Sequence, residues 1–172
     1  MSKRWDLRGA VVLGLLGVLV GTVPTWAQSG FCLIGCAPDR DYILNHKVQE
    51  KNHGFNSDRY WLWIRPQEAA VSALQITTDN NFDGQFNTRA VEVNSRTANK
   101  SYPVGSVTWE EDIRTLTITL DKPLPAQEEI EIVLSQVLNP YTEGLYKLNA
   151  RVLGTEPNPL YRYAGTWTLS IE

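Results

Sequence analysis

Oxygen-bearing side chains recur at short intervals between residues 79 and 87 (DNNFDGQFN). A calcium-binding loop carries ligands at its first, third, fifth and ninth positions, which here are Asp79, Asn81, Asp83 and Asn87. Gly84 provides the glycine of the sixth position, but Ala90 stands where such a loop needs a bidentate glutamate. Asn, Asp and Gly are also the residues that ordinary turns use. A calcium site and a polar turn therefore both remain open, and no other cofactor is expected.

Two tryptophans two residues apart suggest a different kind of site. If the segment is a strand, Trp61 and Trp63 share one face, and Tyr60, Leu62 and Ile64 share the other. An indole can fill space in a core or present a flat ring on which a sugar can stack. Both interpretations stay open for this strand. The aromatic residues that could extend such a platform are Trp109, Tyr161 and Tyr163.

Catalytic signatures are missing from the sequence. It contains no Gly-x-Ser-x-Gly, no His-Glu-x-x-His and no glycine-rich phosphate loop. Acidic residues cluster at 110–112 and at 128–131, and such clusters can supply the paired carboxylates of glycoside hydrolases. They are more simply explained as solvated residues at strand ends. His46 and His53 are the only histidines and lack a metal-binding spacing, so we do not expect an enzyme.

The elements that position these residues are strands. From residue 59 onward apolar residues recur with period two, and turn residues separate the runs. Strands are expected near 60–64, 74–77, 89–93, 107–109, 115–120, 129–134, 145–153 and 164–171. This spacing predicts an all-β fold, a single β-sandwich of about seven or eight antiparallel strands, immunoglobulin-like or related.

The N-terminal segment has the layout of an export signal. Residues 1–8 carry three cations, and residues 9–23 form an uncharged apolar run. Fifteen helical residues span about 22 Å, too short for the roughly 30 Å core of a bilayer. Pro24 follows, with small residues at Thr25 and Ala27, so we expect a cleavable signal peptide at 1–27. The mature chain is then exported, with no transmembrane helix.

The remaining chain divides into an irregular arm at 28–58 and a sandwich domain at 59–172. The arm contains both cysteines, Cys32 and Cys36. A disulfide between them fits an oxidising exported compartment. The alternative is a lipid anchor on Cys36, because residues 33–36 (LIGC) read like a lipoprotein cleavage box. The chain has 16 basic and 19 acidic residues, which gives no indication of a nucleic-acid partner.

The order of several short elements resembles a known family. They are 60–66 (YWLWIRP), 73–76 (ALQI), 88–90 (TRA), 116–125 (LTITLDKPLP), 139–140 (NP), 144–146 (GLY) and 163–167 (YAGTW). From residue 60 to the C-terminus the chain resembles the exported cyanobacterial family of domain of unknown function 2808. The resemblance implies a signal-bearing β-sandwich in the periplasm, thylakoid lumen or cell envelope, with no activity or site residues to carry over.

The sequence thus leads to an exported, non-catalytic binding or structural protein. We expect it to be an accessory of an envelope or luminal protein complex. It would dock through a sheet edge or through the arm at 28–58, with an apolar patch near that arm. The alternative is a carbohydrate-binding module that uses Trp61 and Trp63 on a polysaccharide. A calcium-binding sandwich that uses the loop at 79–87 is the most distant alternative.

Overall fold

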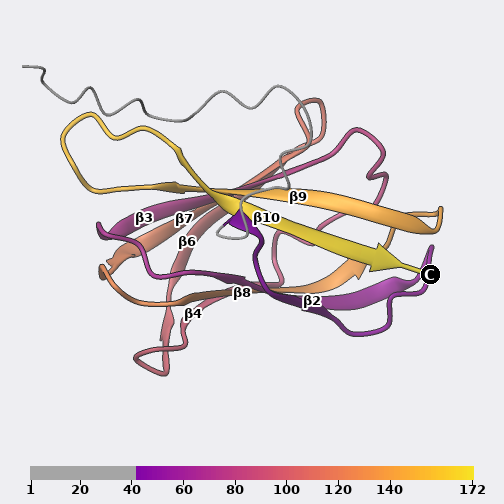
Figure 1. The fold of residues 1–172 in the computed structure, drawn as a ribbon, viewed down its shortest axis with the longest axis horizontal. Coiled ribbons are helices and arrows are strands. Elements are labelled where there is room, and N and C mark those ends of the chain that lie inside the picture. Colours follow the sequence, from indigo (N-terminus) through magenta and orange to yellow (C-terminus); the bar gives the residue numbers. More distant parts are fainter. Residues whose placement is uncertain (1–41) are drawn as a thin grey trace, which may run out of the picture. The chain divides into compact units, whose positions relative to one another are not determined.

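The computed structural model describes residues 42–172, and these form ten strands with no α-helix. In chain order the strands are β1 (His46–Val48), β2 (Asn56–Ile64), β3 (Val71–Thr78), β4 (Val91–Ser95), β5 (Lys100–Tyr102), β6 (Val104–Glu110), β7 (Thr115–Leu124), β8 (Ile130–Leu138), β9 (Gly144–Leu153) and β10 (Arg162–Ile171). They build two five-stranded antiparallel sheets that pack face to face (Figure 1). The predicted all-β sandwich is therefore confirmed.

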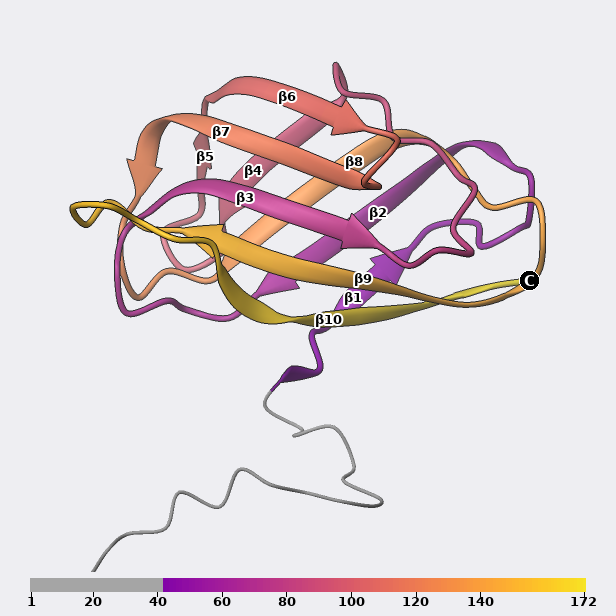
Figure 2. The same cartoon turned by 90° about the horizontal axis from the view of Figure 1, so that it is seen from above.

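The two sheets have different members. Sheet 1 has the order β10-β9-β3-β7-β6, and sheet 2 has the order β1-β2-β8-β4-β5. In Figure 2 the strands of sheet 1 lie in front and run across those of sheet 2. The chain crosses between the layers several times, so each sheet combines segments that are distant in sequence.

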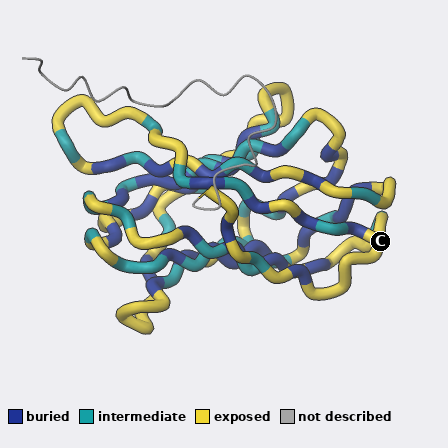
Figure 3. The backbone as a smooth tube through the Cα atoms, in the orientation of Figure 1, coloured by how far each residue is buried: buried dark blue, intermediate teal, exposed yellow. Residues whose placement is uncertain are grey.

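The core lies between the sheets and follows from the period-two pattern. Inward side chains such as Leu62, Ile118, Ile132 and Leu148 are completely buried, and their neighbours along each strand face outward. Buried and exposed stretches alternate accordingly along the strands in Figure 3. Trp167 is also completely buried, and its Nε1 donates a hydrogen bond to a main-chain oxygen of sheet 2. That bond joins the two sheets near their β10 and β2 strands.

The sandwich begins earlier in the chain than residue 59. Leu44 and Val48 are buried, and β1 pairs with β2, so residues 44–58 contribute two strand segments and core contacts. The irregular arm expected over 28–58 thus differs from the structure in its described part. Two strands of three residues, β1 and β5, also raise the total above the predicted seven or eight. Such short strands carry too few residues to produce a readable alternation.

A buried polar network fixes one end of the sandwich. The carboxylate of Asp58 is completely buried and accepts hydrogen bonds from three main-chain N–H groups and from the Asn139 side chain. The Tyr60 hydroxyl donates to Asn139 Oδ1 at 2.6 Å. Burial, followed by the nearby Asp58 charge, raises the pKa of Tyr60 far above its ordinary value. The network therefore ties the start of β2 to the end of β8.

Several predictions concern residues that the structure does not describe. The signal peptide at 1–27, the pairing of Cys32 with Cys36 and a lipid anchor on Cys36 all lie outside the described residues. These stay predictions. Within residues 42–172 no helix is long and apolar enough to cross a membrane.

Candidate functional site

The two tryptophans singled out in the sequence face away from the core. Tyr60, Leu62 and Ile64 alternate with them along β2 and are buried between the sheets. Trp61 and Trp63 lie on the outer surface of sheet 2, where both are half-buried. The strand is therefore not buried on both sides, and neither indole packs between the two sheets.

We call the surface around these rings the indole face. Its members are outward-facing residues of β1, β2 and β8 and of the turn that follows β4, namely Lys47, Arg59, Trp61, Trp63, Arg96, Glu131 and Val133. Lys47 of β1 and Val133 of β8 are the register partners of Trp61 on its two sides. Val133 points away from the core, yet it is only 6% exposed. Its neighbours on the indole face must therefore cover it.

Each indole has a cation stacked on it. The Lys47 Nζ atom lies 4.8 Å from the ring centroid of Trp61, and Arg59 Cζ lies 5.8 Å from the same centroid. Arg96 Cζ lies 5.0 Å from the ring centroid of Trp63. Such contacts contribute about 0.5–1 kcal/mol each at exposed sites. Arg59 could have been placed here from its two-residue spacing to Trp61. Lys47 comes from β1 and Arg96 from the turn after β4, and sequence alone does not align these segments with β2.

Two carboxylates of this region, Glu129 and Glu131, are paired within it. Glu131 accepts a hydrogen bond from Trp63 Nε1 at 2.8 Å and one from Asn94 Nδ2 at 3.3 Å. Glu129 forms an ion pair with Arg96 at 3.1 Å. Both acids therefore orient the rings and cations of the indole face.

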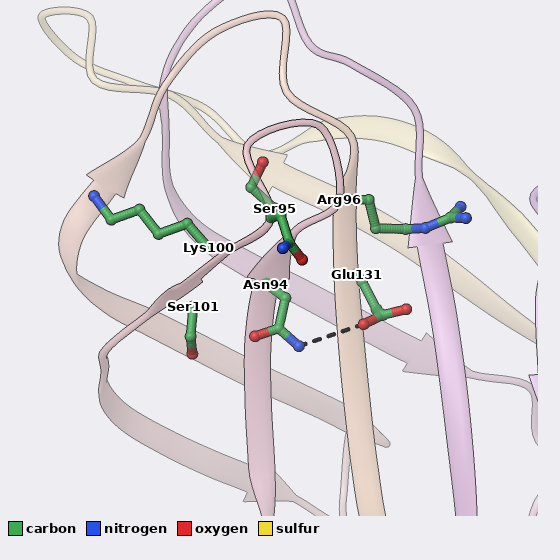
Figure 4. A pocket seen from close by; sticks show the side chains of 7 residues that line it. Asn94, Ser95, Arg96, Lys100, Ser101 and Glu131 are labelled. Atoms are coloured by element: carbon green, nitrogen blue, oxygen red, sulfur yellow. Dashed lines mark hydrogen bonds between the residues drawn. The ribbon is translucent and has the colours of Figure 1, made fainter.

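A shallow polar hollow adjoins Trp63 on the same sheet. Its volume is about 260 Å³, and its walls come from β4, β5 and β8. Figure 4 shows the Asn94 amide hydrogen-bonded to Glu131, with the Lys100 and Arg96 side chains on opposite sides of this pair. Sites that enclose small molecules are typically 300–1,000 Å³ and largely apolar. The hollow is therefore a polar extension of the indole face.

The aromatic residues expected to extend the platform lie elsewhere. Trp109 belongs to β6 of sheet 1, where its ring packs edge-on against Phe86 at 5.1 Å between centroids. Tyr163 belongs to β10, and Tyr161 lies in the segment before that strand. The prediction that these residues extend the platform is therefore wrong. Trp109 and Tyr163 belong to sheet 1 and Tyr161 directly precedes it, whereas Trp61 lies on the outer surface of sheet 2.

The oxygens of the loop at 79–87 hold different segments together. Asp79 accepts main-chain hydrogen bonds from Asn81 at 3.2 Å and from Lys147 at 3.0 Å. Asp83 accepts one from Tyr141 at 3.1 Å. Another candidate ligand, Asn87, accepts a hydrogen bond from the Arg89 main-chain N–H and donates one to Gln136. Residues 42–172 contain no group of three or more His, Cys, Asp or Glu that could hold a metal ion, and calcium at this loop stays a prediction.

Solved structures with a similar fold are remote in sequence. A collagen-binding domain from a Staphylococcus aureus adhesin is 10% identical, with a TM-score of 0.42, over 79% of this chain and 99% of that one. The bacterial hydrophobin BslA is 15% identical, with a TM-score of 0.46, over 76% of this chain and 91% of that one. An uncharacterized immunoglobulin-like protein from Nocardia farcinica is 12% identical, with a TM-score of 0.45, over 76% and 98%.

The family comparison is more direct. None of the curated proteins compared with the chain matches it in sequence. A family model described as "Protein of unknown function (DUF2808)" matches residues 36–171, which include the entire described sandwich. The chain therefore belongs to the DUF2808 family.

Proposed function

We propose that this chain is an exported, non-catalytic binding protein that docks on a protein partner through its indole face. The observation that carries the proposal is the pair of half-buried tryptophans on the solvent side of sheet 2, each stacked with a cation. Tryptophan and arginine are enriched among the residues that dominate protein–protein binding energy. A face that combines both offers large contact area and charge.

The chemistry of the face supports binding rather than catalysis. Glu129 and Glu131 are engaged by Arg96 and Trp63, so neither is free to act as one member of a carboxylate pair. The export signal predicted at 1–27 supports a partner outside the cytoplasm. The periplasm, the thylakoid lumen and the cell envelope are the compartments that fit such a protein.

A protein partner fits the geometry better than a polysaccharide. A sugar stacks on the bare face of an aromatic ring. Here Lys47 lies over Trp61 and Arg96 lies over Trp63, so a stacking sugar would have to displace them. A protein surface can instead contact the cations and the exposed ring edges together.

Polysaccharide binding remains the second candidate. One specific observation favours it: Trp61 and Trp63 are adjacent outward residues on one strand. Each cation–π contact is weak enough for a ligand to exchange with it. In this case Trp61→Ala would abolish retention on polysaccharide from the same envelope.

The test is site-specific photo-crosslinking in the cells from which the protein comes. A photoreactive residue replaces Glu92, which is exposed next to Val133 on the face, or Thr119, which is exposed on sheet 1. We expect one cross-linked protein from the Glu92 position and none from the Thr119 position. The product should disappear in a Trp61→Ala variant whose thermal unfolding shows it to be folded.

Two results would contradict the proposal. One is the same cross-linked species from both positions. The other is a product that persists in Trp61→Ala and in Arg96→Gln, which removes the cation from Trp63 and leaves the indole. Glycans recovered with the protein and lost in Trp61→Ala would favour the second candidate.

A further inference from the structure

A second hollow lies on the opposite side of the molecule, on the outer surface of sheet 1. It has a volume of about 270 Å³ and is bounded by the segment at 42–43, by β9 and by β10. We call it the tyrosine hollow, after Tyr42 and Tyr163. The indole face belongs to the other sheet, so the two sites are independent.

A β-bulge-like irregularity in β10 shapes the hollow. The register of β10 shifts between Tyr163 and Gly165, where Gly165 has a φ of 139°. A side chain at Gly165 would place its Cβ 2.7 Å from the Tyr42 main-chain oxygen and 2.7 Å from Leu44 Cγ. Leu44 N also donates to Thr166 O at 2.9 Å, which holds the segment across β10. Bulges of this kind commonly redirect a side chain next to a functional site.

The ring of Tyr163, next to this irregularity, forms an exposed aromatic wall together with Tyr42. Tyr42 and Tyr163 contact each other with ring centroids 5.3 Å apart and planes tilted by 35°. Each is 47% exposed, and the adjacent Ile43 is 49% exposed. These three side chains form an exposed, largely apolar patch. The wall offers ring surface to a ligand from the solvent side.

Hydrogen bonds beside the wall leave donors unused. Thr166 Oγ1 donates to Asn149 Oδ1 at 2.6 Å, so the Tyr163 hydroxyl must be the donor in its 2.5 Å contact with Thr166. Because the Asn149 side-chain oxygen accepts from Thr166, the orientation of the amide is fixed and its Nδ2 is left free to donate. Lys147 also borders the hollow and makes no ion pair within residues 42–172. Among residues 42–172, no carboxylate lines the hollow.

We propose that the tyrosine hollow binds an acidic sugar, one hexuronate unit of a polysaccharide. The sugar ring would lie on the wall of Tyr42 and Tyr163, and its carboxylate would accept hydrogen bonds from Lys147 Nζ and Asn149 Nδ2. The volume suits one sugar unit, since it falls just below the range of pockets that enclose larger ligands. The free Asn149 donor and the Lys147 charge, with no carboxylate among the described residues that line the hollow, select the acidic sugar over a neutral one.

The experiment is an NMR titration in which digalacturonate is added to the ¹⁵N-labelled full chain. Cellobiose serves as a neutral disaccharide and acetate as a bare carboxylate. Digalacturonate should shift the signals of the Asn149 side-chain amide and the Thr168 backbone amide. The dissociation constant from these shifts should be at least tenfold lower than that of either control. Lys147→Gln should weaken binding at least tenfold, because a charge-assisted hydrogen bond is lost. Lys122→Gln, an exposed lysine of β7, should leave the affinity unchanged.

Each contrary result overturns the proposal. Equal affinity for cellobiose would mean that charge does not select the ligand. Equal affinity for acetate would reduce the hollow to a carboxylate site that does not use the tyrosines. Tyr163→Ala checks the same point, since it should weaken digalacturonate binding without altering acetate binding. No shift at Asn149 at millimolar digalacturonate would also refute the site.

Discussion

Replacing Asp58 by alanine should remove about 3–5 kcal/mol from the free energy of unfolding. Its carboxylate accepts hydrogen bonds from Glu50 N at 3.0 Å, Lys51 N at 3.2 Å, Arg59 N at 2.6 Å and Asn139 Nδ2 at 2.7 Å. A hydrogen bond to a charged group contributes about 1.5–3 kcal/mol, and an unsatisfied buried donor costs about 1–3 kcal/mol. Water can reach some of the main-chain donors after the substitution, so we expect less than the full sum.

Urea denaturation followed by tryptophan fluorescence measures this loss. Tyr60→Phe removes only the hydroxyl that donates to Asn139, and it should cost about 1 kcal/mol. A double-mutant cycle between Asp58→Ala and Asn139→Ala should give a coupling energy of about 1–3 kcal/mol, because the two side chains bond directly. Asp112→Ala is the matched control, since this carboxylate is exposed in a turn and its loss should cost less than about 0.5 kcal/mol.

The reasoning fails if Asp58→Ala costs no more than Asp112→Ala. It also fails if the losses from Asp58→Ala and Asn139→Ala simply add. Either result would mean that water satisfies the donors and that the buried carboxylate does not hold this end of the sandwich.

Further substitutions test other parts of the sandwich. Gly165→Ala should lower the free energy of unfolding by about 2 kcal/mol or more, because the new Cβ meets Leu44 at a strained φ; a shift in the urea midpoint measures this. Burial lowers the pKa of His46 below 6.5, so the unfolded chain takes up a proton first as the pH falls. The free energy of unfolding should then drop below about pH 6.5, and urea titrations of His46→Gln should show a flatter profile. Trp167→Phe should cost about 2 kcal/mol in the same assay, because it leaves a cavity and removes the bond to Trp63 O.

Much of the strand pattern could be predicted from local sequence. The alternation in 115–120 predicted Leu116, Ile118 and Leu120 as inward residues, and all three are buried. The end of that strand could not be predicted, because Pro123 signals a connection. In the structure β7 continues to Leu124 by means of a register shift against β3. A bulge depends on the partner strand, so the sequence of β7 alone does not contain it.

The candidate sites were predictable only in part. Period two placed Trp61 and Trp63 together, but both faces of their strand are apolar, so the pattern could not say which face is buried. Pairing of β2 with β8 decided this, because it turned Tyr60, Leu62 and Ile64 toward the other sheet.

By itself, the sequence determined the fold class, because alternation and turn residues act over a few neighbours and need no knowledge of the partner strand. Tertiary structure decided which strands lie side by side, and with that the cations that reach each tryptophan. It also decided that Tyr42 meets Tyr163, which requires the segment at 42–44 to cross β10 over Gly165. These contacts join residues far apart in the chain. Their energies depend on the burial and register of the whole sandwich, which no local pattern encodes.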